Sequence, residues 1–301
     1  MSEKNISGLI ILDKPAGISS QTAVNKVRRA FNTKRVGHTG TLDPMATGVL
    51  PVLVGSAVKA SELLVSDEKR YEATLKLGLT TDTLDTTGEI LSRFEGQLPT
   101  YEELLSVLPD FTGDIMQTPP MYSALKVSGK KLCDLARSGV EVERQNRPVT
   151  VFSLDAKETE TAGEFLLSVH CSKGTYIRTL CDDIGKALGC GGVMAALRRT
   201  ASGDFSLDAS VDVDTLLSSD EPEKYLIPTD KLFEKLPEVR LPEFYSKLAR
   251  CGNEIYLKKL GLSFEEGARV RVYDSDGDFF AVSECTSFEG GLALKSVKMF
   301  V

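Results

Sequence analysis

A loop rich in glycine and threonine, VGHTGTLDPMATG, carries the acid Asp43 between two more apolar segments. Glycines let the backbone approach a ligand closely and let a neighbouring side chain be held in an unusual direction. A carboxylate presented in this way could act on a bound ligand as a nucleophile or as an acid–base group. An aspartate followed by proline is also common in turns. Taken alone, Asp43 is therefore more typical of a turn or a helix cap.

The segments around this loop predict the elements that must position Asp43. Residues 8–12 form a short apolar run typical of a buried strand, and DKPAGISS after it ends on serines that can cap a helix. The apolar residues that follow share one helical stripe: Ala23, Val24, Val27, Ala30 and Phe31. After the loop, VLPVLVG predicts another buried strand. The loop should thus connect a helix to a strand of the core.

The rest of the chain mixes helical and strand patterns. RYEATLKLG alternates like a strand, TTDTLDTTG is too rich in turn and β-branched residues for a helix, and Gly189 is a plausible stop signal for a helix. Further helices are predicted over residues 57–65, 101–108, 177–188 and, as a short helix, in GGVMAALRRT. Strands are predicted over residues 149–154 and 165–171 and in a C-terminal hairpin around Asp276 and Gly277. The pattern indicates a mixed α/β protein with a C-terminal β module.

Charge is distributed unevenly along the chain. The net charge is −7, but residues 204–243 hold eleven acids and four bases, so the remainder sums to zero. Residues 14–40 hold six bases and no acid, and residues 126–149 hold six bases and three acids. Clustered lysines and arginines beside glycine-rich loops suit phosphate contact, although a charge run is more often a solvated surface. Charge alone does not establish RNA binding.

Cysteines, histidines and the N-terminus exclude several classes of protein. The six cysteines form no C-x-x-C pair, and the chain has two histidines, His38 and His170, which makes a metal site improbable. The first apolar run is five residues long, too short for a signal-peptide core or a membrane span. We expect a cytoplasmic protein with reduced thiols and no metal.

Several long strings, taken together, resemble one family. They are GLIILDKPAGISS, RVGHTGTLDPMATGVLPVLVG, KRYEATLKLG, TDTLDTTG, QTPPMYSALKVSGKKL and KGTYIRTLCDDIG. In this order they resemble the bacterial tRNA pseudouridine-55 synthases of the TruB type over nearly the whole chain. The resemblance implies a cofactor-free isomerase that flips uridine 55 out of the T-loop of tRNA and converts it to pseudouridine.

The resemblance also implies roles for individual residues. Asp43 matches the nucleophile, Arg178 the arginine that pairs with it, and Tyr71 the aromatic residue that stacks on the flipped uracil. In isolation, Arg178 could equally be a surface residue and Tyr71 a core strand residue. Attack at C1′, attack at C6 and elimination through a glycal remain open as chemical routes.

Further positions match substrate contacts of the family. Tyr176 and Leu197 match pocket residues, His38 the residue that fills the gap left by the flipped nucleotide, and Lys59 a position after the strand that follows the loop. Outside the family, Tyr176 and Leu197 would be core residues and His38 a structural one. Residues 120–148 resemble the family's RNA-gripping thumb, although Cys133 stands where the family usually has an aromatic residue.

The implied architecture is a pseudouridine synthase fold, in which helices flank a central, largely antiparallel sheet. We expect a catalytic domain over residues 1–228, with the thumb at about 120–148, and a small PUA-like RNA-binding β domain over residues 229–301. The protein should act on tRNA as a monomer, without protein partners or membrane. Two alternatives are a non-catalytic RNA-binding protein on the same scaffold and the guide-RNA-dependent branch of the superfamily. Intact Asp43, Tyr71 and Arg178 disfavour the first, and the thumb and chain length disfavour the second.

Overall fold

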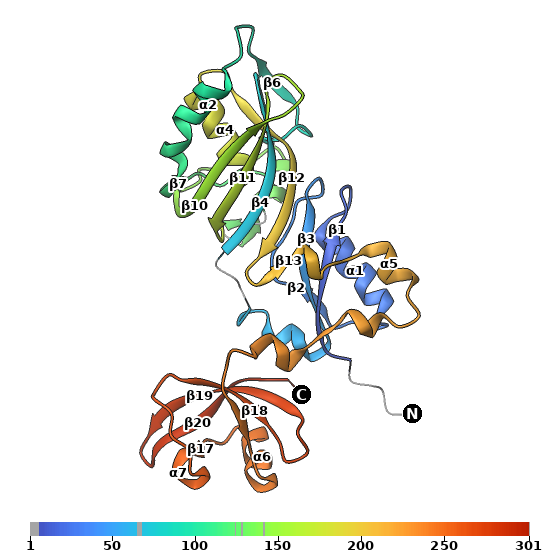
Figure 1. The fold of residues 1–301 in the computed structure, drawn as a ribbon, viewed down its shortest axis with the longest axis vertical. Helices are drawn as coiled ribbons and strands as arrows, with labels where there is room; N and C mark the ends of the chain where they lie inside the picture. Colours follow the sequence, from blue (N-terminus) through green and yellow to red (C-terminus); the bar gives the residue numbers. More distant parts are fainter. Residues whose placement is uncertain (1–5, 65–67, 124, 128, 141, 301) are drawn as a thin grey trace.

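The computed structural model describes residues 6–64, 68–123, 125–127, 129–140 and 142–300. Figure 1 shows two regions built on one large sheet and a separate C-terminal β domain, following one another along the longest axis. The predicted mixed α/β class, with a large, mostly antiparallel sheet and a C-terminal β domain, is confirmed. Among these residues, no helix is long and apolar enough to cross a membrane.

The large sheet has the strand order β14-β1-β3-β12-β4-β11-β10-β7. Its pairs are antiparallel except for β1 with β14 and β3 with β12. The bounds along this path are β1 (Gly8–Lys14), β3 (Thr47–Val54), β4 (Glu68–Leu77), β7 (Gly113–Gln117), β10 (Arg147–Glu158), β11 (Glu164–Ser172), β12 (Gly192–Ser202) and β14 (Val211–Asp212). Off the path, β2 (Val36–His38) pairs with β3, β13 (Phe205–Ser206) with β12 and β15 (Ile227–Pro228) with β1.

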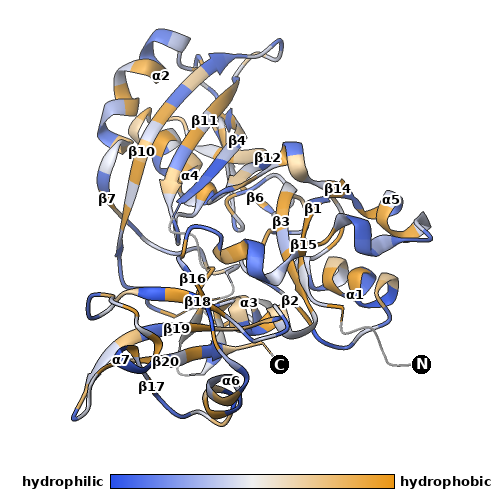
Figure 2. Cartoon of the chain, turned by 60° about the horizontal axis from the view of Figure 1, so that its bottom comes forward, coloured by the Kyte–Doolittle hydropathy of each residue, from blue (hydrophilic) through white to orange (hydrophobic). Residues whose placement is uncertain are grey.

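Helices cover parts of this sheet. In Figure 1, α2 (Tyr101–Val107) and α4 (Ile177–Ala187) lie over the β4–β11–β10 region, and α1 (Ser20–Ala30) and α5 (Val213–Ser218) lie beside β1 and β3. Figure 2 shows hydrophobic and hydrophilic residues alternating around α1, as expected of a helix that covers a sheet with one side. Ser19 caps α1 by accepting a hydrogen bond from the Thr22 amide at 3.0 Å. The predicted helices over 23–31, 101–108 and 177–188 are therefore confirmed.

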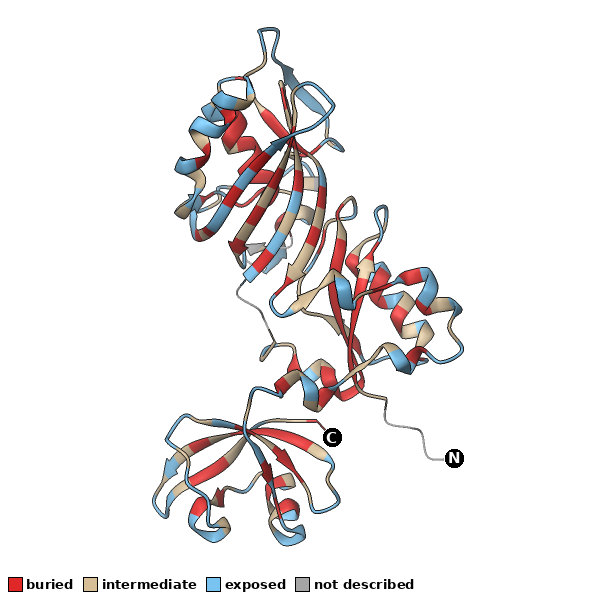
Figure 3. Ribbon diagram, in the orientation of Figure 1, coloured by how far each residue is buried: buried red, intermediate tan, exposed pale blue. Residues whose placement is uncertain are grey.

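Burial follows the strand pattern. Figure 3 shows buried residues alternating with exposed ones along β10, whereas β1 and β3 are buried almost throughout. Strands covered on both faces read as continuous apolar runs, and strands covered on one face alternate. The strands predicted over residues 8–12, 149–154 and 165–171 and in VLPVLVG and RYEATLKLG are confirmed as β1, β10, β11, β3 and β4.

Two predicted helices are wrong. GGVMAALRRT forms most of β12, which pairs with β4 over nearly its whole length. Val193 and Met194 are fully buried there, so the apolar run lacks strand alternation, and adjacent alanines favour a helix locally. The helix expected over 57–65 is instead η1 (Gly55–Ala60), a 3-10 helix without a side-chain cap, and residue 65 lies outside the described residues.

Between β4 and β10 the chain adds shorter elements. They are β5 (Leu79–Thr81), β6 (Ile90–Arg93), η2 (Leu108–Phe111), β8 (Lys126–Val127), β9 (Lys130–Lys131) and α3 (Leu132–Arg137). The last three form the region that we call the thumb, residues 120–148, of which residues 124, 128 and 141 lie outside the described part. TTDTLDTTG begins in β5 and is otherwise a turn-rich loop, as predicted.

The C-terminal β domain holds a five-stranded sheet in the order β16-β18-β19-β20-β17. Its elements are β16 (Glu238–Arg240), α6 (Glu243–Arg250), β17 (Ile255–Tyr256), α7 (Leu257–Leu260), β18 (Arg269–Tyr273), β19 (Phe279–Phe288) and β20 (Gly291–Met299). The predicted hairpin is confirmed as β18 and β19. The connection from β13 runs through η3 (Leu207–Ala209), η4 (Pro222–Tyr225) and η5 (Thr229–Phe233). Ala60, Phe233, Val282 and Phe300 form a small apolar core where η1 and η5 meet this domain.

Candidate active site

Asp43 lies in the loop of residues 39–46 between β2 and β3, and its neighbours fix the backbone on both sides. The Ser20 hydroxyl, at the start of α1, accepts a hydrogen bond from the Leu42 amide at 2.8 Å and donates one to the Leu42 carbonyl at 2.9 Å. On the other side, the Pro44 carbonyl accepts from the Gly17 amide at 2.9 Å. Because Ser20 and Leu42 are both buried, this part of the loop is anchored away from water.

Lys14, the last residue of β1, strengthens the anchor. Its fully buried ammonium donates to the carbonyls of Pro15 and Ile18 at 2.8 Å each and of Pro44 at 3.3 Å. Burial lowers the pKa of Lys14 to about 8, although the Asp43 charge opposes this shift. At neutral pH the group is still mostly protonated, so it holds the loop as a cation.

Arg178, in the first turn of α4, binds the Asp43 carboxylate. Its Nε lies 3.1 Å from Oδ2 of Asp43, and its Nη1 lies 3.5 Å from Oδ2 of Asp85. Nη1 also donates to the Thr83 carbonyl at 3.0 Å, and Nη2 to the Tyr122 carbonyl at 2.6 Å. The guanidinium therefore links Asp43, the loop after β5 and the base of the thumb.

Exposure differs sharply between the two partners of this ion pair. The Arg178 side chain is 7% exposed and the Asp43 side chain 37%. Burial raises the pKa of Asp43 and the nearby Asp85 charge adds to the rise, whereas Arg178 and Lys14 oppose it. An accessible carboxylate held against a buried cation can meet a substrate while its own orientation stays constrained.

Tyr71 lies on β4 opposite Arg199 of β12, and its side chain packs against the main core. Burial raises the pKa of the Tyr71 phenol, while the Arg199 cation beside it lowers that pKa. Asp43 is near enough to raise the Tyr71 pKa slightly. The structure thus brings Asp43, Tyr71 and Arg178 to one side of the sheet around the loop of residues 39–46.

Tyr176 and Leu197 lie beside this group. Tyr176 is the N-cap residue of α4, two positions before Arg178, and the buried Gln117 side chain holds it twice. Gln117 accepts from the Tyr176 amide at 2.9 Å and donates to its carbonyl at 3.3 Å. Leu197 is 9% exposed, and its carbonyl accepts from the Thr47 hydroxyl at 3.4 Å.

His38 lies on β2, which pairs with β3, and Lys59 lies on η1, which follows β3 in the chain. His38 pairs with Val52 of β3, and its Nδ1 is buried without a hydrogen-bond partner. Burial lowers the pKa of His38, and Arg199 adds to the shift. Lys59 is exposed on η1, beyond the far end of β3, about 25 Å along the strand from the end that follows Asp43. The structure therefore does not bring Lys59 to the Asp43 group.

The sequence analysis assigned no role to Arg199, Gln117 or Asp85. Arg199 could have been found, because two adjacent arginines in a strand face opposite sides, so one of Arg198 and Arg199 must point inward. The helical interpretation of this segment hid that signal. Gln117 carries no comparable signal, because its contact with Tyr176 joins residues 59 positions apart.

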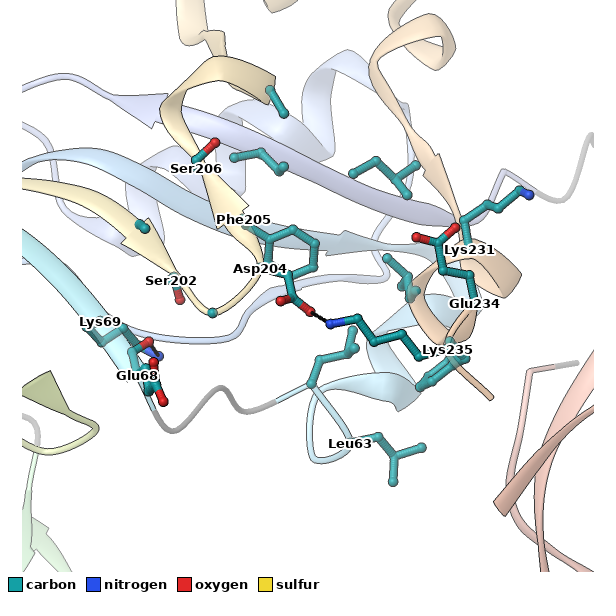
Figure 4. A pocket seen from close by; sticks show the side chains of 18 of the residues that line it. Leu63, Glu68, Lys69, Ser202, Asp204, Phe205, Ser206, Lys231, Glu234 and Lys235 are labelled. Carbon is teal, nitrogen blue, oxygen red and sulfur yellow. Dashed lines mark hydrogen bonds and ion pairs between the residues drawn. The ribbon is translucent and has the colours of Figure 1, made fainter. Parts of the chain in front are cut away.

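A cavity of about 1160 Å³ lies elsewhere, where the catalytic sheet approaches the C-terminal domain. Figure 4 shows its lining, with Asp204 and Lys235 joined across it at 2.7 Å. None of Asp43, Tyr71 and Arg178 lines it. Because an accessible carboxylate paired with a buried arginine is a group that can do chemistry, we take the Asp43 group as the candidate site. Within the described residues, no cluster of three or more His, Cys, Asp or Glu side chains could hold a metal ion.

The site presents a loop carboxylate paired with a buried arginine, on a mixed α/β fold with a large, mostly antiparallel sheet. The model of the TruB family pseudouridylate synthase N-terminal domain matches residues 28–177, and that of the tRNA pseudouridylate synthase B C-terminal domain matches residues 178–234. The chain belongs to the TruB family of pseudouridylate synthases.

Curated relatives agree with this membership over nearly the whole chain. The tRNA pseudouridine synthase B of Saccharophagus degradans is 43% identical, over 96% of this chain and 95% of the relative. That of Dechloromonas aromatica is 46% identical, over 93% of this chain and 92% of the relative.

Solved structures share the fold. A chain in the crystal structure of a Cbf5-Nop10-Gar1 complex is 26% identical, with a TM-score of 0.68, over 99% of this chain and 85% of that chain. A chain in an H/ACA RNP bound to a substrate RNA containing 2'-deoxyuridine also has a TM-score of 0.68, at 24% identity, and shows the likeness of fold alone.

Proposed function

We propose that this protein converts uridine 55 in the T-loop of tRNA to pseudouridine, with Asp43 as the nucleophile. The observation that carries the proposal is the Asp43–Arg178 pair, in which an accessible carboxylate is held by a buried cation 3.1 Å away. The relatives named tRNA pseudouridine synthase B, at 40–46% identity, support tRNA as the substrate.

The reaction breaks the bond from C1′ to N1, turns the uracil and forms a bond from C1′ to C5. The proton on C5 is then lost and N1 gains one, so the product is an isomer of the substrate. Asp43 acts at C1′, at C6 or by assisting loss of the base as a glycal, and each route requires the carboxylate to be ionised. Arg178 favours that ionised form in a site where burial opposes it.

The neighbours of Asp43 suit a flipped base. Tyr71 offers a ring for stacking on uracil and an oxygen that, as the phenolate, can take the C5 proton, and Tyr176 and Leu197 form further walls of the pocket. His38, with a buried Nδ1 that has no partner in the described part of the protein, occupies the gap left by the nucleotide. Lys59 contacts the RNA backbone away from the reacting base.

The basic segments of the chain bind phosphates. Residues 14–40 and the thumb hold twelve bases against three acids, of which Lys14 is buried and holds the Asp43 loop instead, and the acidic excess lies in residues 204–243. Phosphate contacts position an RNA, whereas the shape of the T-loop and the flipped base determine specificity. The C-terminal domain, from about residue 229, is a PUA-like module that contacts the tRNA. The protein acts as a cytoplasmic monomer without cofactor.

Purified protein, incubated alone with an unmodified tRNA transcript, tests the proposal. Mapping pseudouridine by carbodiimide-dependent primer-extension stops should show conversion at position 55. The Asp43→Asn variant should lose at least about 1,000-fold in turnover, since an amide keeps the shape but not the nucleophile, and this loss equals about 4 kcal/mol of barrier. Its affinity for tRNA should change little.

Two outcomes contradict the proposal. Conversion by Asp43→Asn within about tenfold of the wild-type rate shows that another group is the nucleophile. No conversion by the wild type alone, with activity appearing only after a guide RNA and partner proteins are added, places the protein in the guide-dependent branch.

A further inference from the structure

Arg199 is a fully buried cation whose guanidinium donates hydrogen bonds to three backbone carbonyls. The residue is 1% exposed. Its Nε donates to the Val49 carbonyl at 2.7 Å, Nη2 to the Gly40 carbonyl at 3.2 Å and Nη1 to the Thr41 carbonyl at 3.4 Å. Burying a charge is costly unless it is well hydrogen-bonded, so this arrangement needs a reason other than stability.

The three carbonyls bracket Asp43. Gly40 and Thr41 precede it in the loop of residues 39–46, and Val49 follows it in β3. Ser20 and Lys14 hold only Leu42 and Pro44, next to Asp43. Arg199 therefore holds the start of the loop and the strand that follows it, whereas Ser20 and Lys14 hold the residues next to Asp43.

Backbone geometry brings Arg199 to this place. The backbone of Arg199 pairs with Gly48 in the parallel contact of β12 with β3. Gly48 has a φ of +99°, and a Cβ there would lie 2.2 Å from the Arg199 carbonyl oxygen. Only glycine at position 48 lets the two backbones approach so closely. This close pairing places Arg199 where its side chain reaches the carbonyls around Asp43.

The same guanidinium lies beside the phenol of Tyr71. The two residues are opposite each other on β12 and β4, and each influences the pKa of the other. Burial makes a phenolate costly at this position, and the Arg199 charge opposes that cost. The Arg199 cation thus contacts the loop that carries Asp43 and also lies beside Tyr71, the residue that we propose takes the proton from C5.

We propose that Arg199 is a positioning residue that holds the Asp43 loop and stabilises the phenolate form of Tyr71, the form that can take the proton from C5. This inference rests on the proposed function. The Tyr71 phenol first gives its proton to N1 of the rejoined base, which leaves a phenolate. The C5–H bond then breaks, its electron pair forms the C5–C6 double bond, and the proton goes to the phenolate oxygen, so that Tyr71 returns to the phenol. Arg199 stays protonated throughout and exchanges no proton.

The test compares Arg199→Met, Arg199→Lys and the wild type. Arg198→Met is the matched control, because the neighbouring Arg198 meets Asp13 at 2.7 Å and the Thr47 hydroxyl at 3.4 Å on a half-exposed surface, and none of the carbonyls that Arg199 holds. Single-turnover rates are measured with T-arm RNA carrying either hydrogen or deuterium at C5 of the target uridine. Hydrogen exchange of the amides of residues 39–49 is measured without RNA.

Arg199→Met should lower the single-turnover rate about 100-fold, as expected for a small misplacement of reacting groups. Its KM should change less than kcat, and its deuterium isotope effect should exceed that of the wild type, because proton loss becomes slower. Arg199→Lys, which keeps the charge, should recover part of the rate. Exchange over residues 39–49 should increase in Arg199→Met and stay unchanged in Arg198→Met.

Arg199→Met with a rate within threefold of the wild type overturns the inference. So does a reduced rate with an unchanged isotope effect and with unchanged exchange over residues 39–49, because the defect would then lie elsewhere. If Arg199→Met does not fold, Arg199→Lys decides by the same isotope effect and exchange. The exchange readout needs no catalysis, so it tests the loop contacts even if the wild type fails to modify tRNA.

Discussion

The Asp43 carboxylate and the Arg178 guanidinium form an ion pair at 3.1 Å, and only the carboxylate is accessible. Arg178 is simultaneously bound by Asp85 and by the Thr83 and Tyr122 carbonyls. These contacts leave the arginine little freedom to follow a substrate. The ion pair therefore constrains Asp43 from its buried side and leaves the other side of the carboxylate open, where we propose that the substrate binds.

Asp85 should matter for turnover more than for binding. It is buried, accepts hydrogen bonds from the Thr83 hydroxyl at 2.8 Å and the Thr87 amide at 2.9 Å, and faces Arg178 at 3.5 Å. Asp85→Asn loosens Arg178 and should lower kcat about 10- to 100-fold at unchanged tRNA affinity, a loss of about 1.4–2.8 kcal/mol. Steady-state kinetics and filter binding measure both quantities.

Asp82→Asn provides the comparison for Asp85, because Asp82 is an exposed acid of the same loop. It should stay within about twofold of the wild type, a difference below 0.5 kcal/mol. Equal losses in the two variants would show that the Arg178 contact is not what makes Asp85 important.

Replacing Asp43 by asparagine should stabilise the protein at neutral pH. Burial raises the pKa of Asp43 above its ordinary value of 3.8, so the folded protein binds this proton more tightly than the unfolded chain. The stability that protonation contributes is fully present below pH 3.8 and is lost as the pH rises through the folded-state pKa. Asp43→Asn is always neutral, so its Tm should exceed that of the wild type at pH 7, and the difference should vanish at low pH.

Asp212→Asn is the control, because the pKa of Asp212 is shifted in the opposite direction from that of Asp43. Asp212 caps α5 by accepting from the Thr215 amide at 2.8 Å, and this hydrogen bonding lowers the pKa of Asp212. Its contribution to stability is present above the unfolded pKa and is lost as the pH falls, so Asp212→Asn should not raise the Tm at pH 7. A lower Tm for Asp43→Asn than for the wild type at pH 7 argues against a raised Asp43 pKa.

The thumb should contribute affinity rather than chemistry. We proposed that its bases neutralise phosphates, and counterions released in that way make binding depend on salt. Deleting residues 124–146 should flatten a plot of log affinity against log salt concentration, and Lys130→Gln alone should change the slope by about 0.7–0.9. The single-turnover rate at saturating protein should fall much less than the affinity. An unchanged slope after the deletion shows that the thumb does not contact the RNA backbone.

Activity should survive exhaustive treatment with a metal chelator. The isomerisation requires no Lewis acid, and the carboxylate, phenol and guanidinium groups at the site supply the proposed chemistry. The assay needs a tRNA folded in monovalent salt, because magnesium also folds the RNA. Loss of activity that low concentrations of zinc or magnesium restore on such a prefolded tRNA contradicts this expectation.

Local patterns in the sequence determined most of the elements and the chemical centre. The spacing of apolar residues predicted α1, α2 and α4. A helix with one buried side has apolar residues at a period of 3.6, and this period can be recognised without knowing what the helix packs against. The Gly- and Thr-rich context of Asp43, together with the long strings around Tyr71 and Arg178, indicated the family. These strings are contiguous, so they can be recognised before the chain is folded.

Contacts between distant segments were decided only by the tertiary structure. β12 has a locally helical composition, yet it becomes a central strand because β3 and β4 satisfy its backbone on both sides. That pairing brings the Arg199 side chain to the Val49 carbonyl across 150 residues of sequence. It likewise takes the fold to place Asp85 against Arg178, 93 residues away. The sequence was sufficient to predict the reacting groups. Which buried charges surround them depends on the order of the strands, because these contacts join residues too far apart in the chain for any local pattern to predict.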